Sequence, residues 1–108
     1  MKNSQETLDK IDKIEGLEDE VILRVIKDDL KNYEIQGIKE QFIEKLLGDI
    51  NGLSEDEILN KLVESYKKVP PYMGYCHKYW GVKKEILKDK YNIEWYTPSE
   101  ENPLVIYD

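Results

Sequence analysis

The sequence predicts an all-α protein, a small bundle of four to five helices with an extended C-terminal tail. Apolar residues recur at helical spacing in four separate stretches before residue 69. All four prolines lie at or after position 70, and an alternating, strand-like pattern appears only after residue 90. A chain of 108 residues has the size of one domain, so we expect a single helical domain over residues 1–108. Its expected parts are scaffold helices at about 4–68, an aromatic and basic helix at about 72–90, and a tail at 91–108.

The first two helices are expected on either side of Gly16. Ser4 is a residue type that caps helix N-termini, and glycine commonly ends a helix. The second helix begins at Leu17 and carries a regular apolar stripe. The stripe consists of Ile22, Val25, Ile26, Leu30 and Tyr33. Gly37 then predicts a break before a third helix that ends at Gly48. The alternative is one long helix through Gly37, which a single glycine weakens by about 1 kcal/mol without forbidding it.

The fourth helix has the clearest start in the sequence. Ser54 and Glu57 have the spacing of a capping box, and Leu53 and Ile58 are placed to form the hydrophobic staple around it. Pro70 and the proline after it cannot continue a helix, so the fourth helix is expected to end before them.

The tail allows more than one structure. Its alternating residues favour a possible short two-stranded ribbon at 91–96/104–107. The loop between these segments is also compatible with a one-turn helix capped by Thr97 or Ser99. Because an isolated two-stranded ribbon is marginal, we expect an extended tail that lies over the bundle.

The stretch at residues 69–93 differs in composition from the rest of the chain. It contains the only cysteine (Cys76), the only histidine (His77), one of the two tryptophans and four of the eight tyrosines. On a helical wheel, its aromatic and apolar residues fill one half of the cylinder. His77, Gly81, Lys84 and Lys88 form a strip beside that half. Lys83 projects from the apolar half itself.

The aromatic half predicts either a buried helix or an interface. Aromatic residues at helical spacing are usually core, and on this basis we expect Trp80 to be buried. The burial of Trp95, in the tail, is less assured. Aromatic residues are also favoured at interfaces, and a lysine such as Lys83 among apolar neighbours either extends to solvent or meets a partner carboxylate. The candidate binding surface comprises Tyr75, His77, Tyr79, Trp80, Gly81, Lys83, Lys84 and Lys88.

The charge is unevenly distributed along the chain. The net charge of -7 argues against non-specific binding to nucleic acid or membranes by the whole molecule. Residues 67–90, however, carry seven lysines and only two acidic residues, a balance of +5, and residues 91–108 carry -4. This asymmetry predicts either a local anion site or two patches that attract each other within the fold.

Catalytic and metal-binding arrangements are poorly supported. Neighbours on a helix point about 100° apart, so Cys76 and His77 are badly placed to form a nucleophile–base pair. One cysteine and one histidine supply half of the ligands that a zinc site requires. We therefore expect no catalytic residue, no metal ligand and no cofactor.

The sequence as a whole favours a small, acidic, non-enzymatic protein of the cytoplasm that acts by binding another protein. The partner is a second copy of the chain, or a larger protein that this one inhibits or assists. No apolar run is long enough to span a bilayer, and we expect no membrane partner. The alternative is a module that binds a phosphate-bearing ligand, a nucleotide or single-stranded nucleic acid through residues 67–90.

Overall fold

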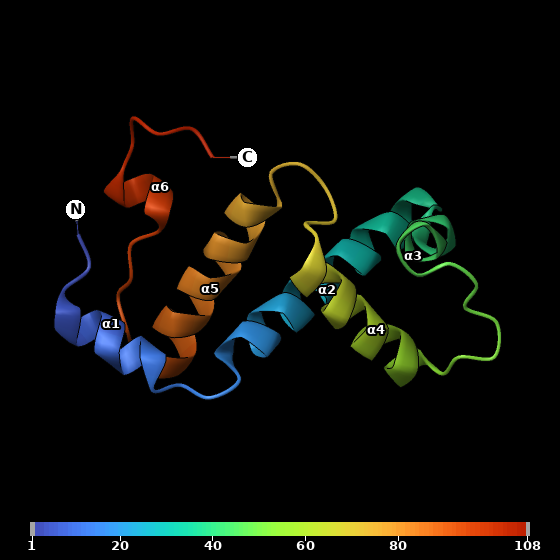
Figure 1. The fold of residues 1–108 in the computed structure, drawn as a ribbon, viewed down its shortest axis with the longest axis horizontal. Coiled ribbons are helices and arrows are strands. Elements are labelled where there is room, and N and C mark those ends of the chain that lie inside the picture. Colours follow the sequence, from blue (N-terminus) through green and yellow to red (C-terminus); the bar gives the residue numbers. More distant parts are fainter. Residues whose placement is uncertain (1, 108) are drawn as a thin grey trace. The chain divides into compact units, whose positions relative to one another are not determined.

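The computed structural model describes residues 2–107 and confirms the all-α prediction. Within these residues it contains six helices and no strand (Figure 1). The helices are α1 (Gln5–Asp12), α2 (Leu17–Gln36), α3 (Lys39–Leu47), α4 (Glu55–Lys68), α5 (Tyr75–Tyr91) and α6 (Pro98–Glu101). None of the helices in this described range is long and apolar enough to cross a membrane.

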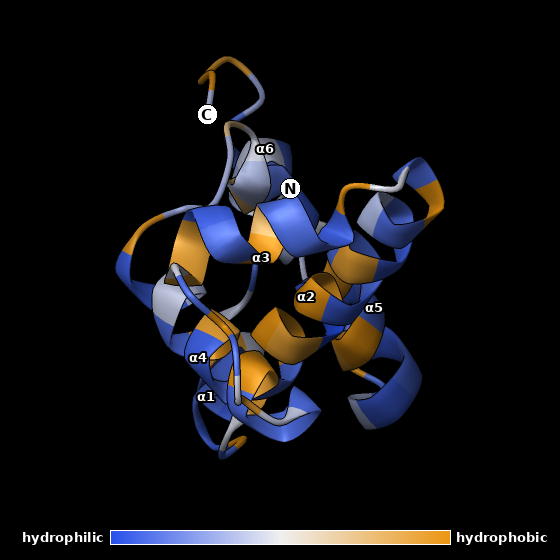
Figure 2. Cartoon of the chain, turned by 90° about the vertical axis from the view of Figure 1, so that its right-hand side faces the viewer, coloured by the Kyte–Doolittle hydropathy of each residue, from blue (hydrophilic) through white to orange (hydrophobic). Residues whose placement is uncertain are grey.

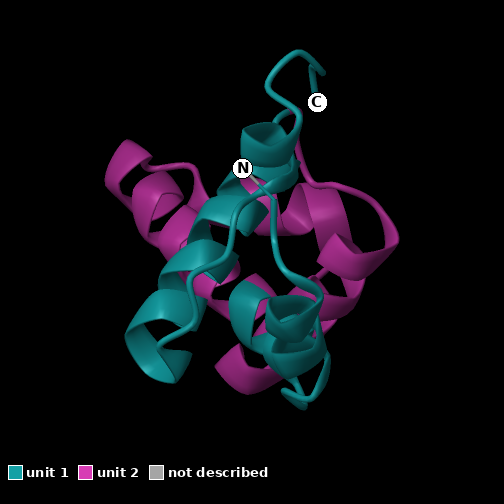
Figure 3. Ribbon diagram, turned by 90° about the vertical axis from the view of Figure 1, so that its left-hand side faces the viewer, with its two compact units in different colours: residues 1–21, 74–108 teal, residues 22–73 magenta. Residues whose placement is uncertain are grey.

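The chain divides into two compact units (Figure 3). Unit 1 combines the two ends of the chain, residues 1–21 and 74–108, and unit 2 is the segment at residues 22–73. Helix α2 belongs to both, because residues 17–36 form one continuous helix. The single domain expected over residues 1–108 stays a prediction.

Unit 2 contains most of α2, together with α3 and α4, and each helix alternates apolar and hydrophilic residues along its length (Figure 2). Its buried apolar residues are Ile22, Val25, Ile26, Leu30, Ile43, Leu62 and Tyr66. The break between α2 and α3 lies where the sequence predicts it. Gly37 has a left-handed φ of +78°, a conformation that glycine adopts at low cost, and this excludes the alternative of one long helix. Across the break, the rings of Tyr33 and Phe42 stack with centroids 4.3 Å apart.

Helix α4 begins with the predicted capping box. The Ser54 hydroxyl accepts a hydrogen bond from the Glu57 backbone N–H at 3.2 Å, and the Glu57 carboxylate accepts one from the Ser54 N–H at 3.3 Å. Two backbone donors that the helix itself leaves unpaired are thereby satisfied.

One carboxylate is buried in unit 2, and two tyrosines hold it. Asp29 on α2 is 5% exposed. Its Oδ2 atom accepts hydrogen bonds from the hydroxyls of Tyr66 at 2.9 Å and Tyr72 at 2.8 Å. Burial and the nearby charge of Asp29 raise the pKa of Tyr66 far above its usual value. Tyr66 therefore stays protonated, and the hydroxyls of both tyrosines stabilise the buried carboxylate as donors.

Unit 1 is built on α1 and α5. Ser4 caps α1 as predicted, since its hydroxyl accepts a hydrogen bond from the Thr7 N–H at 3.1 Å. Helix α5 differs from the prediction at its start, because it begins at Tyr75 and not at Tyr72. The residue before it, Gly74, has a left-handed φ of +80°, and this turn separates residues 70–73 from the helix.

The tail of unit 1 is extended except for the one turn of α6. The possible ribbon at 91–96/104–107 does not form. The alternative one-turn helix is present instead, and Thr97 is its cap. Pro98 occupies the first turn, where its missing N–H costs nothing, and Glu100 completes a second capping box with Thr97. The alternating residues 91–96 comprise the last residue of α5 and an extended segment with no paired strand.

Candidate functional site

The eight residues of the predicted binding surface differ in their exposure on α5. Tyr75 is buried and unavailable to a ligand. Tyr79, Trp80, Lys83 and Lys84 are partly buried, and His77, Gly81 and Lys88 are exposed. Burial, and next the charge of Glu18, raise the pKa of Tyr79 above its usual value, so it remains a neutral phenol.

Trp80 corrects one expectation, because it is only partly buried. The fully buried residues of α5 are Ile86 and Leu87. Leu87 shares the face of Trp80 but lies about two turns further along the helix, so this face is fully buried at Leu87 and only partly buried at Trp80. The indole of Trp80 instead lies between two rings near the surface. It makes edge-to-face contacts with His77, with centroids 5.6 Å apart, and with Tyr107, with centroids 5.1 Å apart. Such contacts are weakly stabilising and specific in geometry.

The buried tryptophan of unit 1 is Trp95, which is 6% exposed. Its ring accounts for the unusual position of Lys83, whose ammonium lies 4.6 Å from the ring centroid in cation–π geometry. Burial lowers the pKa of Lys83, and the charges of Asp12 and Glu18 oppose that shift. Lys83 therefore contacts the tail of its own chain.

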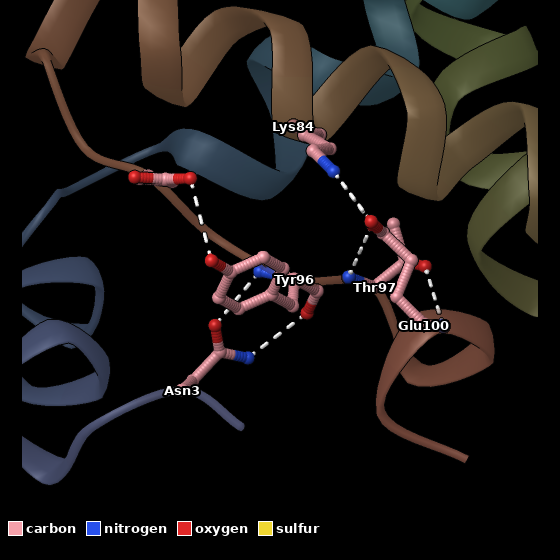
Figure 4. A network of polar contacts seen from close by, with 6 residues as sticks. Asn3, Lys84, Tyr96, Thr97 and Glu100 are labelled. Atoms are coloured by element: carbon pink, nitrogen blue, oxygen red, sulfur yellow. Dashed lines mark hydrogen bonds and ion pairs between the residues drawn. The ribbon is translucent and has the colours of Figure 1, made fainter. Parts of the chain in front are cut away.

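Lys84 is bound to α6 by a two-pronged ion pair (Figure 4). Its ammonium donates to both carboxylate oxygens of Glu100, at 2.6 and 2.8 Å. The same carboxylate accepts a hydrogen bond from the Thr97 N–H at 3.1 Å. The hydrogen bond from Lys84, and then that from Thr97, lower the pKa of Glu100. Lys84 also lies 5.6 Å from the centroid of the Tyr96 ring.

Asn3 fixes the segment just before α6 (Figure 4). Its side-chain nitrogen donates to the Tyr96 carbonyl at 2.9 Å, and its side-chain oxygen accepts from the Tyr96 N–H at 2.7 Å. The Asn3 backbone N–H also donates to Glu101 at 3.3 Å. Residues 95–101 are thus held by a buried ring, a paired amide and an ion pair.

Beyond α6 the chain returns to the beginning of α5. The carbonyl oxygen of Tyr107 lies 2.8 Å from His77 Nε2 and accepts a hydrogen bond from it, while the Tyr107 ring contacts Trp80. Between the two attachments, Leu104, Val105 and Ile106 are 97%, 53% and 92% exposed. These residues form the apolar stretch next to the C-terminus in Figure 2.

We call His77, Trp80 and Lys84 the α5 strip, and residues 98–107 the C-terminal segment. The strip binds three kinds of group: a carboxylate at Lys84, a backbone carbonyl at His77 and an aromatic ring at Trp80. Together these groups are characteristic of a polypeptide. Gly81 is not part of this strip but follows Trp80 directly in α5, and a side chain added there would meet no atom within 4 Å. The surface beside it is therefore open.

A hollow of about 470 Å³ lies at the C-terminal end of α5. It is lined by Lys84, Lys88, Asn92, Ile93, Glu94 and Trp95. Two lysines and an aromatic ring could contact an anionic ligand there. Lys84 is already paired with Glu100, however, and the C-terminal end of a helix repels anions. Within residues 2–107, no group of three or more His, Cys, Asp or Glu side chains is arranged to hold a metal ion.

His77, Trp80 and Lys84 were among the candidate residues of the sequence, and whether they bind a partner stays a prediction. Asn3, Glu100 and Tyr107 were not among the candidate residues, although all three take part in this network. Only Glu100 had a local signal, since it follows Thr97 at capping-box spacing. The other two residues are recruited by contacts between distant parts of the chain, and no local pattern encodes such contacts.

The chain matches no protein-family model, no curated protein and no solved structure.

Proposed function

We propose that this protein is a non-enzymatic binding protein and that the α5 strip is the surface on which it receives a segment of another polypeptide. One observation carries the proposal: the strip already holds a segment of polypeptide, its own C-terminal segment, through the carboxylate, carbonyl and ring contacts described above.

The exposure of the strip supports the proposal. His77 is exposed, and Trp80 and Lys84 are partly exposed, so a partner can reach all three. Tryptophan and tyrosine are favoured in interfaces because they combine a large apolar area with a polar group. The basic balance of residues 67–90 favours a partner segment that carries acidic residues.

Selection from a displayed peptide library against the immobilised full-length protein tests this function. A His77→Ala/Trp80→Ala/Lys84→Glu variant serves for counter-selection, after circular dichroism has shown that it is folded. We expect the selected peptides to combine acidic and aromatic residues and to bind the variant at least tenfold more weakly. Selected peptides that bind both proteins equally, or the absence of any selected peptide, would overturn the proposal.

One version of this function is self-association, in which the partner is a second copy of the chain. The second copy carries the same Glu100 and Tyr107, so its C-terminal segment has the right chemistry for the strip. Exchange of an identical element between two copies is a common route to dimers. Sedimentation velocity over a hundredfold concentration range tests this form. A protein that stays monomeric throughout would leave only a different polypeptide as the partner.

A phosphate-bearing ligand remains the second candidate, and the hollow at Lys84 and Lys88 is the observation that favours it. Lys88 is exposed and makes no ion pair with the residues described. Titration with ATP and with an oligouridylate at low and high salt tests this candidate, because each phosphate contact releases a counterion and makes the affinity fall with salt. No binding at low salt would remove it.

A further inference from the structure

We infer that the C-terminal segment is an internal occupant of the α5 strip, and that the partner is an acidic peptide segment with an aromatic residue, which must displace it. This inference rests on the proposed function and adds to it the chemistry of the partner and a means of regulation. Three features of unit 1 support it: the spacing of the contacts on the strip, the way in which the segment is held, and the contacts that limit its movement.

The contacts on the strip are regularly spaced. His77, Trp80 and Lys84 lie three and four residues apart, so they share one face of α5. Glu100 contacts Lys84 in the middle of the helix, and Tyr107 contacts His77 and Trp80 nearer its start. The bound segment therefore runs in the direction opposite to α5.

The spacing of these contacts along α5 indicates how far apart the carboxylate and the ring of the partner peptide should be. Four residues of helix advance about 6 Å along the axis, which is the distance from Trp80 to Lys84 along α5. In an extended peptide, side chains on one face repeat every two residues, or about 6.6 Å. An extended partner with a carboxylate at one position and an aromatic ring two residues later can therefore satisfy both Lys84 and Trp80. The C-terminal segment advances seven residues, from Glu100 to Tyr107, to reach from Lys84 to Trp80. It needs this many because it includes the end of α6 and a further turn at Asn102.

The internal segment is held at its ends and not in its middle. Leu104 and Ile106 are more than 90% exposed, so this part of the chain gains little apolar burial by lying along α5. The Lys84 and Glu100 side chains are themselves 38% and 36% exposed, and water screens their attraction. A second ligand with the same carboxylate and ring can therefore compete for both attachment points.

We expect the C-terminal segment to detach from the strip only as far back as Thr97, because the residues before Thr97 are held by other contacts. Trp95 is buried, and Asn3 holds both the N–H and the carbonyl of Tyr96. These contacts do not involve the strip. The segment after Thr97 can consequently detach while the preceding residues stay in place, and unit 1 keeps its buried tryptophan.

Competition between the internal segment and an added peptide tests the inference. The probe is a fluorescent synthetic peptide with the sequence of residues 98–107, and its binding to the full-length protein is followed by anisotropy. In the Glu100→Gln/Tyr107→Ala variant, the internal segment loses its charge and its ring. Glutamine still supports the capping box, so α6 is retained. We expect this variant to bind the probe about tenfold more tightly than the unaltered protein.

Two controls make the result specific. Leu104→Ser changes a fully exposed side chain of the segment and should leave the affinity for the probe unchanged. Lys84→Glu should abolish binding, and a probe with lysine at its Glu100 position should restore it, because the charges of the ion pair are then exchanged.

The outcomes separate this inference from the function on which it rests. If the unaltered protein and the Glu100→Gln/Tyr107→Ala variant bind the probe equally, with Lys84→Glu still abolishing binding, the strip binds peptides but the internal segment is no competitor, and the inference is wrong. If the probe binds to neither, the inference is likewise wrong. The proposed function would then stand or fall with the library selection alone.

Discussion

Replacement of each tryptophan in turn gives the strongest test of the packing of unit 1. Trp95 is buried and lies under the ammonium of Lys83, whereas Trp80 is only partly buried. Replacing a buried aromatic side chain by alanine typically costs about 3–5 kcal/mol, because both the transfer energy and the packing are lost. This loss is a large part of the roughly 5–15 kcal/mol by which a domain is stable.

Trp80→Ala should have a smaller effect. The side chain leaves no sealed cavity, and the edge-to-face contact with Tyr107 is worth about 0.5–1.5 kcal/mol. We therefore expect Trp80→Ala to lower the free energy of unfolding by about 1–2 kcal/mol and Trp95→Ala by at least twice as much. The ranking is opposite to the one that the sequence alone indicates.

Urea denaturation followed by circular dichroism measures both values. Each variant keeps one tryptophan, so its fluorescence reports the environment of the remaining ring during the same titration. Trp95→Phe is the matched control, because it keeps an aromatic ring beneath Lys83 and should recover much of the lost stability. Equal destabilisation by Trp80→Ala and Trp95→Ala would refute a unit 1 in which Trp95 is the buried ring and Trp80 the half-exposed one.

Three further predictions concern single contacts. Ser54→Ala should destabilise the protein by about 1 kcal/mol through loss of the α4 cap, and Ser54→Asp should not, as urea denaturation can show. Tyr66→Phe should cost about 1.5–3 kcal/mol, because the charged Asp29 loses a donor. The raised pKa of Tyr66 means that its stabilising contribution is fully present below its usual value of 10.0 and is lost as the pH rises above it, so the unaltered protein should lose stability faster than Tyr66→Phe in alkaline urea titrations. The pKa of Glu100 is lowered, so its effect on stability runs in the opposite direction with pH. The ion pair that attaches α6 should be fully formed above pH 4.5, the usual pKa of glutamate, and should be lost as the pH falls through the lowered pKa. Amide hydrogen exchange at residues 99–101 that does not accelerate on acidification, once the intrinsic effect of pH on exchange is corrected for, would contradict this last expectation.

The scaffold helices were predictable because their signals are local. The Ser4 cap, the left-handed glycine at 37 and the capping box at Ser54 each act over a few residues, and all three are present. The start of α5 was missed for a related reason. Aromatic periodicity extends back to Tyr72, although Gly74 offers a left-handed turn that ends this continuity.

The exposure of the two tryptophans could not be derived in the same way. A helical wheel gives the angle of Trp80 around α5, but which angle is buried depends on what packs there. Leu87 lies at nearly the same angle as Trp80 and is fully buried, so burial also depends on the position along the helix, and the buried ring of unit 1 is Trp95 from the tail. The side-by-side placement of His77 and Lys84 on α5 follows from local spacing, whereas their contacts with the tail do not. Their role as a binding site stays a prediction.

The uneven charge of the chain has a partial explanation in the pairing of Lys84 with Glu100, since a basic and an acidic stretch of the same chain meet there. This pairing allows the two candidate functions to be separated by salt. An acidic peptide that displaces the C-terminal segment exchanges one carboxylate on Lys84 for another, so the number of ion pairs is unchanged and the affinity should vary little between 50 and 300 mM salt (about twofold or less). A phosphate ligand at Lys88 adds new ion contacts, and its affinity should fall steeply over the same range. In the Glu100→Gln variant the internal ion pair is absent, so peptide binding should become salt-dependent as well. Peptide binding with equal salt dependence in the two proteins would show that the carboxylate of Glu100 does not compete for the strip.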